Sequence, residues 1–142
     1  MKAFYDNYPP LFLLGNGILY CVVAWLFLAE PQVWFDRLSL QLQSAEGYVE
    51  LRAIYIGLMA AVGLYLVIAA MLDSLRASAL LFTLLSYGGL ASVRAWGIFV
   101  EGSTNPLMLQ LLIAETVCLL GSFLGLYCIY RIKSRHRNPY FM

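Results

Sequence analysis

Three charged side chains lie inside or at the edge of long apolar runs. Arg94 falls within Leu80–Val100, Glu115 within Leu107–Ile129, and Arg52 at the start of a third run. A charge surrounded by hydrocarbon is costly, so each of these side chains needs a partner or a function. Opposite charges at such positions can fix two helices in register, hold the polar head of a lipid, or move protons. They are the candidate site.

The composition is that of a membrane protein. The chain has 142 residues, of which 62% are hydrophobic and 12% charged. A soluble domain of this length needs far more polar surface to cover its core. The formal net charge is +1, which gives no broad basic surface, so nucleic acid is not an expected partner.

The apolar runs predict four membrane spans within one domain, residues 1–142. The spans cover about 11–29, 48–72, 77–100 and 107–130, each long enough to cross a bilayer. Polar turns at Asp73–Arg76 and Glu101–Pro106 are short, so successive spans should be antiparallel neighbours. The predicted fold is an all-α membrane protein, an antiparallel four-transmembrane-helix bundle.

The segment 31–47 is too polar to be a span. Trp34, Leu38, Leu42 and Ala45 recur at spacings of three or four, which predicts an amphipathic helix lying in the membrane interface. An ordered connecting loop is the alternative. The last segment, 131–142, is a basic tail.

The distribution of Lys and Arg predicts the orientation. With both termini inside, the outer side holds only Arg37 and Arg52, whereas the inner side carries six basic residues, namely Lys2, Arg76, Arg131, Lys133, Arg135 and Arg137. Basic residues concentrate on the cytoplasmic side. We therefore expect both termini to be cytoplasmic.

The two mid-span charges have similar estimated depths. Arg94 lies about six residues, or roughly 9 Å, below the outer end of its span, and Glu115 about eight residues, or roughly 12 Å. Helical spacing places Tyr87, Arg94 and Glu101 on one stripe, with Thr83 on the same face. Glu115, Cys118 and Ser122 form a second stripe, and Arg52, Tyr55 and Gly63 a third. Arg94 and Glu115 are predicted to be direct or near-direct partners.

Glu50 precedes Arg52 by two residues, so the two side chains point to opposite sides of a helix. Glu50 is predicted instead to cap the second span, because a carboxylate is favourable at a helix N-terminus. The candidate cluster, for ligand binding or for structure, comprises seven residues: Arg52, Tyr55, Arg94, Glu115, Glu50, Glu101 and Tyr87.

These residues also carry a family resemblance. The motif Glu50-Leu51-Arg52-Ala53-x-Tyr55-x-Gly57-Leu58, then Arg94-x-x-Gly97, Gly102, Pro106 and Glu115, resembles a bacterial four-span family known as domain of unknown function 4345. Ile56 stands where many members have a glycine. The layout is similar, more distantly, to the sterol-biosynthesis scaffold family, which has four spans and no catalytic activity. The resemblance implies a fold and a site, and no reaction.

Other motifs give weak signals. Gly121-x-x-x-Gly125 is typical of close helix packing, either within the protein or at a dimer seam. Cys21, Cys118 and Cys128 fall in apolar runs, where buried thiols act as small hydrophobes. The single histidine, His136, lies in the tail, so no metal site and no cofactor are expected.

We therefore expect a non-catalytic accessory or scaffold subunit of the bacterial inner (cytoplasmic) membrane. It would contact membrane lipids and another membrane protein, and could hold a lipid or other amphiphile at the outer-leaflet cluster. A small oligomeric transporter or channel-like protein is the alternative, in which case a homo-oligomer is expected. An intramembrane enzyme acting on a lipid is a weaker alternative, with Tyr, Glu and Arg as the acid–base groups.

Overall fold

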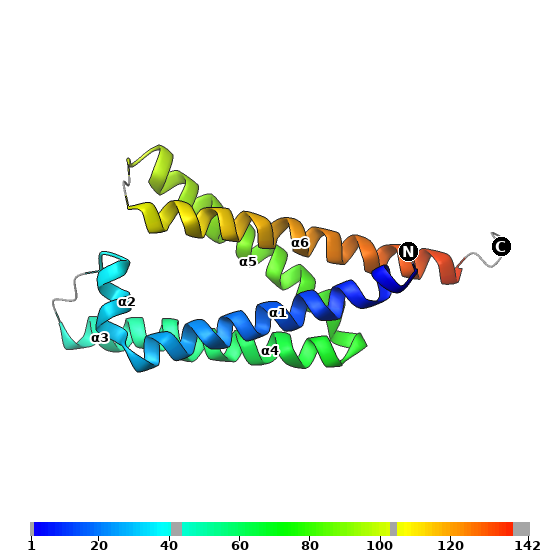
Figure 1. Cartoon of the computed structure of the whole chain (residues 1–142), viewed down its shortest axis with the longest axis horizontal. Helices are drawn as coiled ribbons and strands as arrows, with labels where there is room; N and C mark the ends of the chain where they lie inside the picture. Colours follow the sequence, from blue (N-terminus) through cyan, green and yellow to red (C-terminus); the bar gives the residue numbers. More distant parts are fainter. Residues whose placement is uncertain (1, 41–43, 103–104, 138–142) are drawn as a thin grey trace. The chain divides into compact units, whose positions relative to one another are not determined.

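The structure is a computed structural model that describes residues 2–40, 44–102 and 105–137. Every regular element in these residues is a helix (Figure 1). In chain order they are α1 (Lys2–Ala29), α2 (Pro31–Arg37), α3 (Ala45–Arg52), the π-helix η1 (Ala53–Leu58), α4 (Met59–Met71), α5 (Asp73–Phe99) and α6 (Pro106–Arg137).

Four stretches of helix are long and apolar enough to cross a bilayer: Phe4–Ala29, Ala45–Met71, Asp73–Phe99 and Pro106–Ile132. Large apolar side chains on these helices point outward, as at Val93, Phe99 and Tyr130, which are 70% or more exposed. A soluble protein does not expose so much continuous apolar surface, whereas a lipid bilayer solvates it. The predicted class, an all-α multi-pass membrane protein with four spans, is confirmed.

The first helix begins earlier than the predicted first span. α1 starts at Lys2 and continues through Pro9 and Pro10, which the sequence places ahead of the helix. Tertiary contacts occupy these early turns: the Tyr8 hydroxyl donates to the carbonyl of Gly121 at 3.1 Å. Prolines within membrane helices are tolerated when neighbouring groups compensate for the missing backbone hydrogen bonds.

The segment after α1 is a shorter helix than predicted. α2 ends at Arg37, where Ser39 adopts a left-handed conformation (φ 59°). The amide of Leu40 donates to the carbonyl of Phe35, and that of Ser39 to Asp36, which is the Schellman pattern that closes a helix. The predicted helix between the first two spans is therefore present, but it ends at Arg37 and does not continue through residues 38–40. Leu42, like the rest of 41–43, lies outside the described residues.

The second span begins within the segment assigned to that amphipathic helix. Ser44 is the N-cap of α3, and its hydroxyl accepts a hydrogen bond from the amide of Gly47 at 3.1 Å. A serine oxygen at this position satisfies an amide that has no partner inside the helix. The prediction that Glu50 caps this span is thus wrong, because Glu50 lies in the second turn of α3.

Residues 73–76, predicted as a turn, form the first turn of α5 instead. Arg76 pairs with Asp73 and donates through Nε and Nη2 to the carbonyl of Ala70, at 3.2 and 2.9 Å. The arginine thereby satisfies a carbonyl near the end of α4, a role that basic side chains often take at helix C-termini. Leu72 alone separates α4 from α5.

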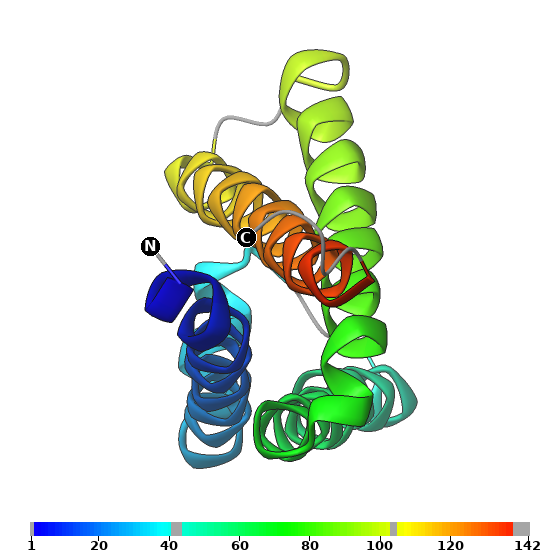
Figure 2. The ribbon, with the colours of Figure 1, turned by 90° about the vertical axis from the view of Figure 1, so that its right-hand side faces the viewer.

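Contacts divide the chain into two compact units. The first contains residues 1–13 and 69–142, and the second residues 14–68. In the first, α5 and α6 form a hairpin and cross one another at an angle, as Figures 1 and 2 show. After the turn that joins the two helices, α6 begins at Pro106, as the sequence predicts. The Asn105 side chain accepts a hydrogen bond from the amide of Leu107 at 2.9 Å.

In the second unit, α1 and α4 are in backbone contact. A Cβ placed on Gly63 would lie 2.9 Å from the carbonyl oxygen of Gly17 and 2.6 Å from the sulfur of Cys21. A Cβ on Gly17 would lie equally close to the carbonyl oxygen of Gly63. Glycine is therefore required on both helices here, which is the arrangement that small residues permit in membranes.

Candidate functional site

The hairpin of α5 and α6 is joined by polar contacts between its predicted stripes. The hydroxyl of Ser122 lies 3.0 Å from that of Thr83, and both residues are buried. One turn further toward the hairpin turn, the side chains of Tyr87 and Cys118 are within hydrogen-bonding reach. The stripes predicted for spans three and four therefore face each other. We call this row of contacts the polar seam.

Glycine sets how closely the helices approach at the far end of the polar seam. A Cβ on Gly125 would lie 2.7 Å from Leu80, and a Cβ on Gly121 would overlap the ring of Phe12. Both glycines of the Gly121-x-x-x-Gly125 motif thus pack within the first unit. This confirms the internal-packing interpretation of that motif. Toward the turn the crowding falls, since a Cβ on Gly97 would meet only Glu101 at 3.8 Å.

Arg94 and Glu115 form the predicted ion pair. Arg94 Nε donates to Oε2 of Glu115 at 2.9 Å, and Nη2 donates to Oε1 at 2.8 Å. Glu115 is 7% exposed, and the Arg94 side chain is largely buried. Such a two-bond contact between a guanidinium and a carboxylate is both stronger and more directional than a single bond. It also satisfies both oxygens of the buried carboxylate.

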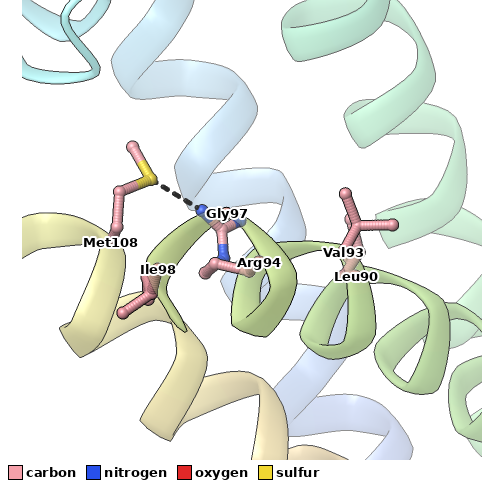
Figure 3. Close-up of a pocket in the computed structure, with 6 residues that line it drawn as sticks. All are labelled: Leu90, Val93, Arg94, Gly97, Ile98 and Met108. Carbon is pink, nitrogen blue, oxygen red and sulfur yellow. Dashed lines mark hydrogen bonds between the residues drawn. The ribbon is translucent and has the colours of Figure 1, made fainter. Parts of the chain in front are cut away.

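The rest of the Arg94 guanidinium faces an apolar pocket. Nη1 donates to the sulfur of Met108 at 3.1 Å, a contact drawn in Figure 3. The pocket has a volume of about 200 Å³, and its lining comes from α5 and one residue of α6: Leu90, Val93, Arg94, Gly97, Ile98 and Met108. Figure 3 shows Arg94 extending from α5 past Gly97 toward Met108. Arg94 supplies the charged group of this pocket.

The other members of the predicted cluster have different surroundings. Tyr87 is buried on the polar seam. Glu101 follows the end of α5 and is exposed. Among the described residues, the carboxylate that pairs with Arg94 is that of Glu115 and not that of Glu101. Arg52, Tyr55 and Glu50 belong to the second unit. Glu50 and Arg52 are exposed there, and the Arg52 guanidinium lies over the ring of Tyr48, 5.5 Å from its centroid.

Tyr55 belongs to an aromatic cluster in the second unit. Its ring stacks on that of Phe27 with centroids 4.5 Å apart, and meets that of Phe35 edge-on at 5.9 Å. Tyr55 also lies in the π-helix η1, which interrupts the second span directly after Arg52. π-helical turns inside α-helices are uncommon and often occur at functional sites. This turn was not predicted from the sequence.

Met108 and the apolar lining of the pocket were also missed. Met108 precedes Glu115 by seven residues, a spacing that places both on one face of α6. That signal was available, but a methionine in an apolar run is ordinarily packing. The pocket itself depends on the crossing of the two helices, which spacing along one helix does not report.

Metal ligation finds no support within the described ranges. No group of three or more His, Cys, Asp or Glu side chains there could hold a metal ion. The cysteines Cys21, Cys118 and Cys128 are free thiols. The described site therefore offers one ion pair, guanidinium N–H donors that face the pocket, and an apolar lining.

The four spans and the buried ion pair define a multi-pass membrane protein with a polar site between two of its helices. The chain belongs to the family described as a domain of unknown function (DUF4345), whose model matches residues 10–126. The match extends from the third turn of α1 into α6 and includes Arg94 and Glu115. No curated protein and no solved structure matches the chain. The more distant similarity to the sterol-biosynthesis scaffold family is not supported by these comparisons.

Proposed function

We propose that this protein is a non-catalytic accessory or scaffold subunit that holds a lipid or other amphiphile in the pocket beside Arg94. One observation carries the proposal. Arg94 is fixed in place by Glu115, yet part of its guanidinium faces an apolar pocket rather than a second carboxylate. Ligand sites commonly combine an apolar lining with a few convergent polar groups.

The same geometry argues against the enzyme and transporter alternatives. A general acid or base needs to exchange a proton with a substrate within hydrogen-bond reach. Each oxygen of Glu115 already accepts a hydrogen bond from Arg94, and Glu115 is not among the residues that line the pocket. A transported cation would have to compete with this bidentate pair for the same oxygens.

The proposed setting is the bacterial inner membrane, with both termini in the cytoplasm. The basic residues support this orientation, because they concentrate in the two terminal segments and at the connection between the second and third spans. The Arg94 pocket would then lie in the outer leaflet. We further propose that a larger membrane protein is the partner, since nearly all of the chain is span or short connection.

Native mass spectrometry of the gently solubilised protein tests the function. We expect the protein to retain an amphiphile and to co-purify stoichiometrically with a larger membrane protein. Gly97→Leu should fill the pocket and release the amphiphile, because a side chain at Gly97 meets no backbone. Gly89→Leu is the matched control: Gly89 lies on α5 outside the pocket lining, with open space beside it. A homo-oligomer without a bound amphiphile would support the transporter alternative instead.

Cysteine labelling tests the orientation. In a background lacking the three native cysteines, Glu101→Cys should react with an impermeant reagent from the outside of intact cells. Ser134→Cys should react only after the membrane is opened. Both positions are exposed in the structure. The reverse pattern would move the pocket to the inner leaflet.

A further inference from the structure

The charge balance around Arg94 indicates what kind of head the pocket accepts. We infer that the site selects an amphiphile whose head is uncharged and presents a hydrogen-bond-accepting oxygen, such as an ester carbonyl or a hydroxyl, rather than a phosphate or carboxylate. This inference rests on the proposed function, because it concerns the ligand of the same pocket. It adds the chemical class of that ligand.

The first step is the neutrality of the pair. The positive charge of Arg94 is matched by the carboxylate of Glu115, at donor–acceptor distances of 2.8 and 2.9 Å. An anionic head brought to the guanidinium would add a second negative charge beside a buried carboxylate that is 7% exposed. In a medium of low dielectric constant an uncompensated charge is strongly disfavoured. An uncharged head leaves the balance intact.

The second step counts donors. A guanidinium has five N–H groups. Two of them donate to Glu115 and one to the sulfur of Met108. In the described part of the chain, the other two have no acceptor. The site therefore offers N–H donors without offering net positive charge, which suits an uncharged oxygen.

The third step concerns Met108. A thioether sulfur is a weak acceptor, so the bond from Nη1 to Met108 is poorer than a bond to oxygen. The methionine side chain is flexible and adapts to its surroundings. A ligand oxygen can take the place of the sulfur on Nη1 while the thioether packs against the ligand. The pair with Glu115, on the other edge of the guanidinium, does not change.

The size of the pocket fits the entry of one slender group. Its volume of about 200 Å³ is smaller than the 300–1,000 Å³ typical of sites that enclose a drug-sized ligand. The remaining lining is aliphatic side chains and a glycine. The head and the first part of a tail would therefore occupy the pocket, with the rest of the ligand in the surrounding bilayer.

The test compares two lipids that differ only at the head. The purified protein in mild detergent is titrated with dioleoylglycerol or with dioleoyl phosphatidic acid, and bound lipid is counted by native mass spectrometry. We expect the wild-type protein to favour dioleoylglycerol by roughly tenfold in affinity. Glu115→Gln keeps the side-chain shape but leaves Arg94 with its full charge, so this variant should favour phosphatidic acid. Gly97→Leu should bind neither lipid, and Gly89→Leu should behave as wild type.

Each outcome separates the inference from the proposed function. In one outcome both lipids bind, Gly97→Leu abolishes the binding of both, and the wild type prefers phosphatidic acid. The inferred class of head is then wrong, but the amphiphile site stands. If neither lipid binds, or Gly97→Leu changes nothing, the proposed function itself fails. Should Glu115→Gln not fold, the wild-type preference and its loss in Gly97→Leu still decide the question.

Discussion

The two units of this protein join their helices by different means. In the hairpin of the first unit, α5 meets α6 through the polar seam, where hydroxyls face each other and Arg94 binds Glu115. In the second unit, α1 meets α4 through glycine-to-glycine backbone contact, and aromatic rings pack at one end. One contact is specified by hydrogen-bond donors and acceptors, the other by shape.

This difference follows from the physics of helices in lipid. Lipid tails solvate an apolar side chain as well as a neighbouring helix does, so burial in itself does not hold two membrane helices together. Close backbone approach increases van der Waals contact, and polar groups associate because the alternative is to leave them unpaired in hydrocarbon. A polar seam also determines which residue meets which, because each donor needs its own acceptor. A site that must hold a group in one geometry is better placed on the seam.

The largest effect is expected when one charge is removed from the polar seam. Arg94→Leu or Glu115→Leu should each lower the free energy of unfolding by about 3–5 kcal/mol, because the remaining charge is left unpaired in an apolar setting. The double variant should recover a substantial part of the loss. Unfolding in mixed micelles measures all three.

The control for this cycle is Gln110→Leu, which replaces an exposed polar side chain on α6 and should leave stability nearly unchanged. The coupling free energy between Arg94 and Glu115 is what the double-mutant cycle isolates. Simple additivity of the two single effects would mean that the ion pair does not hold the hairpin in register.

The matching change in the second unit is Gly63→Ala. The added methyl group would lie 2.9 Å from the carbonyl oxygen of Gly17, and backbone cannot move aside as a flexible side chain can. Overpacking of this kind typically costs about 1–3 kcal/mol. Thermal unfolding in detergent should show the loss. Gly15→Ala, also on a membrane helix but with open space beside it, should show no loss. Alanine favours a helix more than glycine does, so an equal loss at Gly15 would mean that close approach to Gly17 does not explain the effect at Gly63.

A smaller effect is expected at the aromatic end of the second unit. Tyr55→Leu removes the ring that stacks on Phe27 at 4.5 Å. Aromatic pairs contribute about 0.5–1.5 kcal/mol beyond the area that they bury. Tyr55→Phe keeps the ring and serves as the control, so equilibrium unfolding should distinguish the two variants. If Tyr55→Phe loses as much as Tyr55→Leu, the hydroxyl and not the stack is responsible.

The smallest effect should be the coupling between Thr83 and Ser122. Hydrogen bonds between membrane helices average about 0.6 kcal/mol in double-mutant cycles. Thr83→Val and Ser122→Ala, alone and combined, should therefore give a coupling near this value in the same unfolding assay. A coupling as large as that of Arg94 and Glu115 would show that the hydroxyls contribute as much to the polar seam as the charges do.

The sequence by itself determined the four spans and the pairing of the two mid-span charges. A run of about twenty apolar residues spans a bilayer regardless of its neighbours, because hydrocarbon thickness sets the length. The pairing of Arg94 with Glu115 was predictable for a related reason. A short turn makes their helices neighbours, and similar depth below that turn brings the side chains together.

The points where helices begin and end were only partly predictable from the sequence. Pro106 starts α6 as predicted, because proline suits the first turn of a helix wherever that helix lies. The end of α2 at Arg37 was not predicted, since a serine at a left-handed position is a weaker signal than a glycine would be. The spacing of Trp34 and Leu38 therefore suggested a helix longer than the one that forms.

Tertiary structure alone decided the features that make the hairpin a site. The crossing of α5 and α6 opens space at Gly97 and closes it at Gly125, and it directs Arg94 toward Met108. The π-helical turn at Tyr55 and the continuation of α1 through Pro9 are of the same kind. At each of these places a side chain contacts a residue far away in the chain: Tyr55 stacks on Phe27, and Tyr8 donates to Gly121. Periodicity reports which residues share a face of one helix, but not how closely, or at what angle, that face meets another.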